Sequence, residues 1–382
     1  MTDLVPFADD LPSMTLPAAM DGRHGENRAR GGVRQITADT DVEAILLWLA
    51  EYRDSPHTLR SYRKESIRLL MWATHWLGKP LSSLTREDLL AYESFLANPP
   101  VTWADPYRPR RGGNRRLFAG PLSPRSVRQT MGILSGLFAY LVAAGYLAGN
   151  PLALRRNRQR GLSRRATVER YLNPGLWQAV LDFIDTLPQG TQRERQHYER
   201  VRWLFRLLYG AALRASEVAQ AKAGNLIQKR GNWWLHVRGK GGVEGEVPVS
   251  DELMADLARY RQFYGLPAMP SPLDTTPLVM SITGHTDQFL SPTAIYLVVK
   301  EIFRRTATAT EAVDPASAAT LRRASTHWLR HTAATHQADA GNDIRHIQKN
   351  LRHASIETTA IYLHSEDDQR HAKTTGRRLE AD

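Results

Sequence analysis

The sequence contains no cysteine. This absence excludes disulfide bonds, a thiolate nucleophile and a zinc site built on cysteine, although it says nothing about the cellular compartment. Any covalent chemistry therefore has to use another nucleophile.

Long apolar runs and a signal segment are missing as well. No window approaches the roughly 18 consecutive apolar residues that a membrane span needs. The first residues, MTDLVPFADDLPSM, show no basic stretch followed by an apolar one, so no secretory signal is visible. The sequence therefore predicts a protein without a membrane partner, located in the cytoplasm of a bacterium or in a phage or mobile-element context.

Acidic residues are in the minority. The chain has 51 Lys and Arg against 39 Asp and Glu, which gives a net charge of +12. Such an excess favours a polyanionic partner, above all nucleic acid, because neutralising phosphates releases condensed counterions. Most of these bases are arginines, which suit two-pronged phosphate contacts. A GC-rich genome would also raise the arginine content, so arginine preference alone decides nothing.

The length of 382 residues favours two domains. Proline and glycine interrupt residues 1–40, which show no sustained periodicity, so we expect a flexible arm there. Amphipathic patterns predict a helical domain over residues 41–153, with a loop insertion at 99–121. A polar and basic stretch at 154–168 predicts a linker. The second domain then covers residues 169–382 and ends in a polar tail.

The second half combines helical patterns with one β-rich region. Residues 232–250, NWWLHVRGKGGVEGEVPVS, contain two β-rich runs around a glycine-rich turn, which predicts a hairpin. The flanking segments have mostly helical periodicity. The predicted fold class is therefore mainly α with a small antiparallel β region, an α+β arrangement.

Several polar residues are not explained by their apolar surroundings. His327 and Arg330 lie three residues apart in THWLRHTAATH, so a helix places both on one face, where they suit an anion. His327 and His331 have the spacing of a metal pair, but no carboxylate lies within that turn and no HExxH motif is present, so we predict no metal.

Arg214 and Glu217 follow the apolar run WLFRLLYGAAL. A surface ion pair there would contribute only about 0.3–0.5 kcal/mol, whereas in a partly buried position the carboxylate would hold the guanidinium in place. Three further residues carry weak individual signals: Lys240 in the hairpin turn, His353, and Tyr362 on a helix after His353.

The order of these residues is more specific than any one of them. The sequence resembles the tyrosine recombinase (phage integrase) family, whose signature fits Arg214, Lys240, His327, Arg330, His353 and Tyr362. HWLRHTAATH and LRHASIETTAIYLH resemble the two most specific motifs of the family nearly residue for residue. The similarity of pattern extends from about Thr40 to Ser365. It implies a two-domain DNA clamp, in which a helical core-binding domain is followed by the catalytic domain.

The sequence departs from the family pattern in three places. AALR stands where Gly-Leu-Arg is common, which puts Ala212 at the glycine position. LRH replaces the usual Leu-Gly-His, which puts the bulky Arg352 beside the expected active centre. The insertion at 99–121 lengthens the first domain.

The resemblance implies a site-specific DNA recombinase that works without metal or other cofactor. Tyr362 would attack a DNA phosphodiester to form a 3′-phosphotyrosyl link, and Arg214 and Arg330 would clamp its non-bridging oxygens. His327 and His353 would donate further hydrogen bonds, with His327 the better candidate for assisting deprotonation of the phenol.

The same resemblance gives roles to the surrounding residues. Lys240 would protonate the leaving 5′ oxygen, Glu217 would orient Arg214, and His331 would be structural. The expected partners are double-stranded DNA at specific recombination sites and three further copies of the chain in a homotetramer.

The basic linker is expected to contact DNA phosphates, through Arg155, Arg156, Arg158, Arg160, Arg164 and Arg165. Two other classes of protein remain open at this point. A type IB topoisomerase would use similar residues to relax DNA, and a non-catalytic DNA-binding regulator would need the basic surface but not Tyr362.

Overall fold

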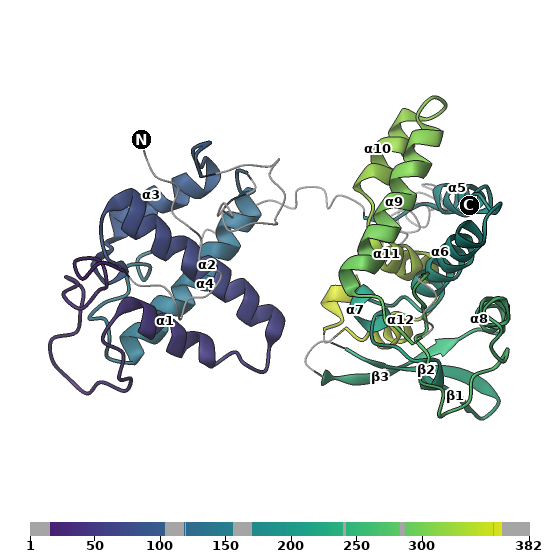
Figure 1. Cartoon of the computed structure of the whole chain (residues 1–382), viewed down its shortest axis with the longest axis horizontal. Coiled ribbons are helices and arrows are strands. Elements are labelled where there is room, and N and C mark those ends of the chain that lie inside the picture. The colour runs from purple at the N-terminus through teal and green to yellow at the C-terminus, as the bar shows by residue number, and fades with distance from the viewer. Residues whose placement is uncertain are drawn as a thin grey trace, which may run out of the picture. The chain divides into compact units, whose positions relative to one another are not determined.

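A computed structural model gives the structure of residues 16–103, 118, 120–155, 170–239, 242–282, 287–353 and 355–360. The chain divides between Arg165 and Ala166 into two compact units. Helices dominate both units, and the second also holds a three-stranded antiparallel sheet (Figure 1). The predicted fold class, mainly α with a small antiparallel β region, is confirmed.

The helices of the first unit follow the predicted amphipathic patterns. They are α1 (Asp41–Ala50), α2 (Pro56–Met71) with its π-helical continuation η2 (Trp72–Leu77), the short 3₁₀ turn η3 (Leu81–Ser83), α3 (Arg86–Ala97) and α4 (Pro124–Ala143). The side chains of Thr40, Thr85 and Ser123 cap α1, α3 and α4 by accepting a backbone N–H of the first turn. Ser55, by contrast, makes no such bond to α2.

The prediction of a flexible arm does not hold for residues 16–40. The backbone N–H groups of Asn27 and Ala29 donate to the carbonyls of Ser82 and Tyr146, at 2.9 and 3.1 Å. The Arg28 guanidinium lies 3.9 Å from the centre of the Tyr146 ring. The segment has no periodicity because it uses hydrogen bonds to other segments instead of its own helix or strand ladder. Residues 1–15 lie outside the described residues.

The two ends of the insertion at 99–121 pack on the first unit. The Trp103 ring meets the Phe95 ring edge-on, at 5.4 Å between centroids. Phe118 is 2% exposed and its ring lies under the Arg68 guanidinium. The segment between them, residues 104–117, lies outside the described residues.

The second unit contains the remaining helices. They are α5 (Pro174–Asp185), α6 (Gln192–Gly210), α7 (Ala215–Val218), the 3₁₀ turn η4 (Ala223–Asn225), α8 (Asp251–Phe263), α9 (Pro292–Thr310), α10 (Pro315–Arg323), α11 (Thr326–Asp339), α12 (Ile344–Leu351) and α13 (Glu357–Ala360). The helical periodicity predicted for this half did not delimit α5, α7 or α10 individually. Across the described part of the chain, no helix has both the length and the apolar character needed to cross a membrane.

The predicted hairpin corresponds to β2 (Asn232–Arg238) and β3 (Glu244–Val249), paired antiparallel with Leu235 opposite Val247. A further strand that the sequence did not predict, β1 (Leu226–Lys229), pairs with the other edge of β2, so the order is β1-β2-β3. Leu235, Val237 and Val247 are buried in the core of the second unit. The sheet therefore anchors the hairpin against the helices.

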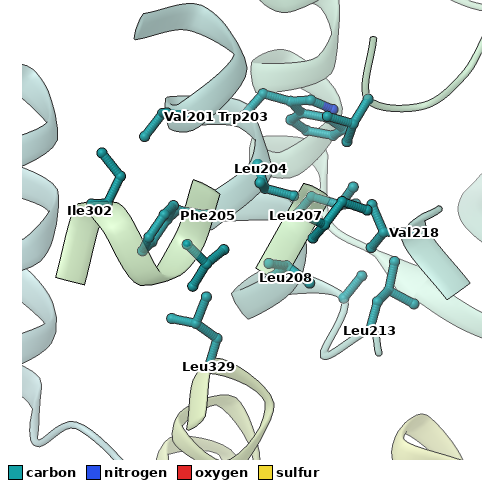
Figure 2. Close-up of a cluster of buried hydrophobic side chains, with 14 of the residues drawn as sticks. Val201, Trp203, Leu204, Phe205, Leu207, Leu208, Leu213, Val218, Ile302 and Leu329 are labelled. Carbon is teal, nitrogen blue, oxygen red and sulfur yellow. The ribbon is translucent and has the colours of Figure 1, made fainter. Parts of the chain in front are cut away.

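The core of the second unit is centred on α6. Its apolar face contributes Val201, Leu204, Phe205 and Leu208, all completely buried. Figure 2 shows these side chains facing apolar residues from α9, α11 and the segment after α6. The core thus joins the chain segments that carry Arg214, His327 and Arg330.

Candidate active site

Arg214 and Glu217 form a closed pair at the start of α7. Arg214 is the N-cap residue of this short helix, and Glu217 is the third residue within it. The Glu217 carboxylate accepts from the backbone N–H of Arg214 and from its Nη1, each at 2.8 Å. The side chain of Glu217 is 1% exposed and that of Arg214 is 33% exposed. The buried Glu217 carboxylate therefore holds the Arg214 guanidinium in place, while part of the guanidinium stays accessible.

Arg330 lies on α11 and is held mainly by main-chain oxygens. Its Nη1 donates to the Ala212 carbonyl at 2.6 Å, and its Nη2 donates to the Leu351 carbonyl. Nη1 also lies 3.9 Å from Oε2 of Glu217. At 1% exposure Arg330 is among the largest fully buried side chains, so its position is fixed by the fold.

The apolar core brings the two arginines together. Leu213 precedes Arg214 and Leu329 precedes Arg330, and both leucines are fully buried in the cluster around α6 (Figure 2). Each arginine therefore directly follows a leucine whose side chain is packed in the core and cannot shift without opening it. This explains how residues far apart in the sequence converge on the single carboxylate of Glu217.

A third arginine reaches the same carboxylate. Nη2 of Arg352 donates to Oε2 of Glu217 at 2.5 Å. Arg352 follows α12 with a backbone φ of 52°, in the left-handed region. Burial by itself would raise the pKa of Glu217, but the charge of Arg352 and the hydrogen bonds from Arg214 hold that pKa below its ordinary value. Glu217 is therefore ionised at neutral pH.

Three histidines surround the arginines. Burial first, and then the charges of Arg330 and Arg214, lower the pKa of His327, and the same causes lower the pKa of His353 to about 4. The ring of His331 meets that of His327 edge-on at 4.6 Å between centroids, and burial together with the charge of His327 lowers the pKa of His331 to about 4. His331 and His353 are therefore neutral at pH 7.

The segments around Lys240 and Tyr362 are only partly within the described residues. His353 shares a hydrogen bond of 2.9 Å between its Nδ1 and the hydroxyl of Thr359 on α13. Tyr362 lies three residues beyond Thr359, outside the described residues, as does Lys240 in the turn between β2 and β3. The structure thus brings together Arg214, Glu217, His327, Arg330 and His353, while the places of Lys240 and Tyr362 stay predictions.

The linker arginines are mostly beyond the described ranges. Arg155 is described, and its Nη2 lies 3.1 Å from Oε1 of Glu93 on α3. Its predicted contact with DNA therefore competes with an ion pair inside the first unit. Arg156, Arg158, Arg160, Arg164 and Arg165 lie outside the described residues, and their predicted DNA contacts are untested.

Two contributions to the site were missed by sequence reasoning. The ion pair between Arg352 and Glu217 joins residues 135 positions apart, and only the unusual arginine in LRH signalled it. The second is the segment that enters the second unit. The Leu172 backbone N–H donates to the Thr332 hydroxyl at 2.9 Å, and its carbonyl lies 3.0 Å from Nε2 of His336. These bonds fasten the entering chain to α11, and no local pattern in the sequence marks them.

The chain is similar in sequence to known proteins. The profile of the phage integrase family matches residues 178–369, half of the chain. Tyrosine recombinase XerA of Pyrococcus furiosus is 31% identical over 185 residues, which cover 48% of this chain and 54% of that protein. Tyrosine recombinase XerC of Oceanobacillus iheyensis is 27% identical over 342 residues, 87% of this chain and 93% of that protein.

A solved structure agrees in fold. The post-cleavage complex of the XerH site-specific recombinase with a palindromic difH substrate matches with a TM-score of 0.56 at 18% identity, over 82% of this chain and 79% of that one. Together with the profile match and the ordered site residues, these similarities show that the chain belongs to the phage integrase family of tyrosine recombinases.

Proposed function

We propose that the protein is a site-specific DNA recombinase, which cuts and rejoins double-stranded DNA through a covalent 3′-phosphotyrosyl intermediate on Tyr362. The observation that carries this proposal is the convergence of Arg214 and Arg330 on the buried Glu217 carboxylate, at distances of 2.8 and 3.9 Å. Two fixed guanidinium groups suit one phosphodiester better than any small neutral substrate.

The arginines supply the main electrostatic contribution. When the Tyr362 oxygen attacks phosphorus, negative charge develops on the two non-bridging oxygens. Arg214 and Arg330 offer N–H donors in a fixed fork, and the core holds them in place before the reaction begins. Such donors stabilise the transition state because they need no reorganisation when the charge appears.

His327 fits the task of taking a proton from the phenol. The ordinary pKa of tyrosine is about 10, so the nucleophile is protonated at neutral pH and needs a base. Burial and the neighbouring charges of Arg330 and Arg214 lower the pKa of His327, which keeps a ring nitrogen available as an acceptor. His353, also neutral, would add a hydrogen bond to the phosphate.

The bond that breaks joins phosphorus to the 5′ oxygen, and Lys240 would protonate this leaving group. The 5′ hydroxyl of a partner strand then attacks the phosphotyrosyl link, which restores the phosphodiester and releases Tyr362. Because the phosphotyrosyl link conserves the bond energy, the cycle needs no high-energy cofactor. We further propose a tetramer that pairs two DNA sites, acting in the cytoplasm.

A nicked duplex tests the proposal. Target sites would be selected from random DNA by binding to the full-length protein, and a nick beside the cleavage position would trap the adduct by loss of the short fragment. We expect a covalent protein–DNA adduct on a denaturing gel. Tyr362→Phe should bind the same site and form none, because only the nucleophilic oxygen is removed. An undiminished adduct with Tyr362→Phe would refute the assignment.

A further inference from the structure

Glu217 is shared by three guanidinium groups, whereas its predicted role of orienting Arg214 involves only one. Arg214 occupies Oε1 at 2.8 Å, whereas Oε2 receives Arg352 at 2.5 Å and lies 3.9 Å from Arg330. The contact with Arg352 is the shortest of the three. The carboxylate therefore has its tightest charge partner in a residue that the reaction scheme leaves without a role.

Without Arg352, the net positive charge of Arg214, Arg330 and Glu217 is smaller than the negative charge of the transition state. Attack of a phenolate on a phosphodiester places two negative charges in the pentacoordinate transition state. Arg214 and Arg330 bring two positive charges, but the Glu217 carboxylate, 1% exposed, cancels one of them at short range. Arg352 compensates that carboxylate, so the net charge of the four groups is +2.

The fold holds Arg352 against the carboxylate. Its Nη1 donates to the Asn350 carbonyl at 2.8 Å, and its side chain is 11% exposed. Gly245 of β3 leaves the space for its stem: a Cβ at Gly245 would lie 2.8 Å from Cδ of Arg352. The left-handed backbone at Arg352, φ 52°, turns the side chain into this space despite the strain. A surface arginine would need none of these features.

From these contacts we propose that Arg352 is a positioning residue for DNA cleavage. It neutralises and fixes Glu217, and thereby leaves the positive charges of Arg214 and Arg330 available to the scissile phosphate. The role rests on the proposed function. Arg352 acts through Glu217 and does not itself contact the DNA.

The first test removes the positive charge of Arg352 from the protein or the negative charge of the scissile phosphate from the DNA. Arg352→Met keeps the length of the stem and loses the charge, and adduct formation on nicked DNA should slow about 10- to 100-fold, as when a partner of a directly acting group is removed. On DNA whose scissile phosphate is a neutral methylphosphonate, the same variant should lie within about threefold of wild type, because less charge needs neutralising. Arg352→Lys should keep most of the wild-type rate on both substrates.

The matched control is Arg304→Met, which makes the same change in net charge. Arg304 lies on α9, is 63% exposed and pairs with Glu301, so cleavage should be unaffected. Because each variant is compared with itself on two substrates, a smaller folded fraction cannot imitate the result. A defect of Arg352→Met that is equal on phosphodiester and methylphosphonate would make its role purely structural and overturn the proposal.

The second test asks whether Arg352 works through Glu217. In a Glu217→Gln background the carboxylate charge is gone, so adding Arg352→Met should slow cleavage by no more than about threefold beyond the single variant. An undiminished defect would mean that Arg352 meets the DNA directly, against the proposal. If wild-type protein formed no adduct, the proposed function would fall together with this role; a wild-type rate in Arg352→Met would overturn the role of Arg352 alone.

Discussion

Nη1 of Arg330 donates to the carbonyl oxygen of Ala212 at 2.6 Å, and Ala212 has a backbone φ of 47°. This left-handed residue forms the turn between α6 and α7, and its conformation aims the carbonyl at the guanidinium. Arg352 has a similar φ of 52° and directly follows Leu351. The Leu351 carbonyl accepts a hydrogen bond from Nη2 of Arg330. Both positions are those where the family commonly has glycine, the residue that adopts this conformation without strain.

We predict that Ala212→Val is destabilising and slows cleavage. A β-branched side chain is poorly tolerated at positive φ, and Ala212 is 1% exposed, so two added methyl groups also overpack the site. The free energy of unfolding should fall by about 2–4 kcal/mol. Urea unfolding and adduct formation would be measured together.

Ala212→Gly is the matched control. Relief of backbone strain should stabilise the fold, whereas the lost methyl contact and the freer unfolded chain oppose it, so the net change should stay within about 1 kcal/mol. A valine variant as stable and active as wild type would show that the turn does not set the position of Arg330.

The candidate site residues could be proposed from the sequence because the family motif keeps them in a fixed order. Arg214 and Arg330 were identified from the sequence, and the structure brings both to the Glu217 carboxylate. Their distances depend on the packing of α6 and α11, which no local pattern encodes. The ion pair of Arg352 with Glu217 was not predictable for the same reason.

The fold shows the same limit. Strong amphipathic periodicity predicted α6 and α9, and β-rich runs predicted the hairpin of β2 and β3. The strand β1 (Leu226–Lys229) has only four residues and is defined by its pairing with β2, so its local signal was too weak. Residues 16–40 were misjudged because their order comes from hydrogen bonds to distant segments.

The basic linker provides a prediction about salt dependence. If its arginines contact phosphates, neutralising Arg156, Arg158, Arg160 and Arg164 should weaken binding to all DNA sequences alike. The slope of log binding constant against log salt should flatten by roughly 0.9 per lost contact. Arg155→Gln should change the slope less, since Glu93 lies 3.1 Å from that guanidinium. An unchanged slope in the fourfold variant would mean that the linker does not bind DNA.

The buried histidines predict loss of stability in mild acid. The pKa of His331 and of His353 is lowered from 6.5 to about 4 in the folded protein, by burial and by neighbouring positive charges. Between these values the unfolded chain binds protons that the folded protein does not. The free energy of unfolding should therefore be intact above pH 6.5 and decrease as the pH falls toward 4.

Urea unfolding of the DNA-free protein at pH 7.5, 6 and 5 would measure this effect. His331→Gln should make the dependence on pH shallower, whereas His346→Gln, at an exposed position of α12, should leave it unchanged. The same pH dependence in His331→Gln and wild type would rule out His331 as a source of the acid sensitivity.

Lys240 is predicted to be the general acid, and a change of leaving group tests this role alone. An alkoxide is a poor leaving group and needs a proton, whereas a thiolate leaves without one because a thiol has a much lower pKa. Lys240→Ala should therefore cleave ordinary DNA poorly but recover most of its rate on DNA with sulfur at the 5′ bridging position. Arg330→Ala should show no recovery, since the proposed task of its buried guanidinium is to stabilise charge on the non-bridging oxygens. Equal defects of Lys240→Ala on both substrates would leave Lys240 as a binding residue or a bystander.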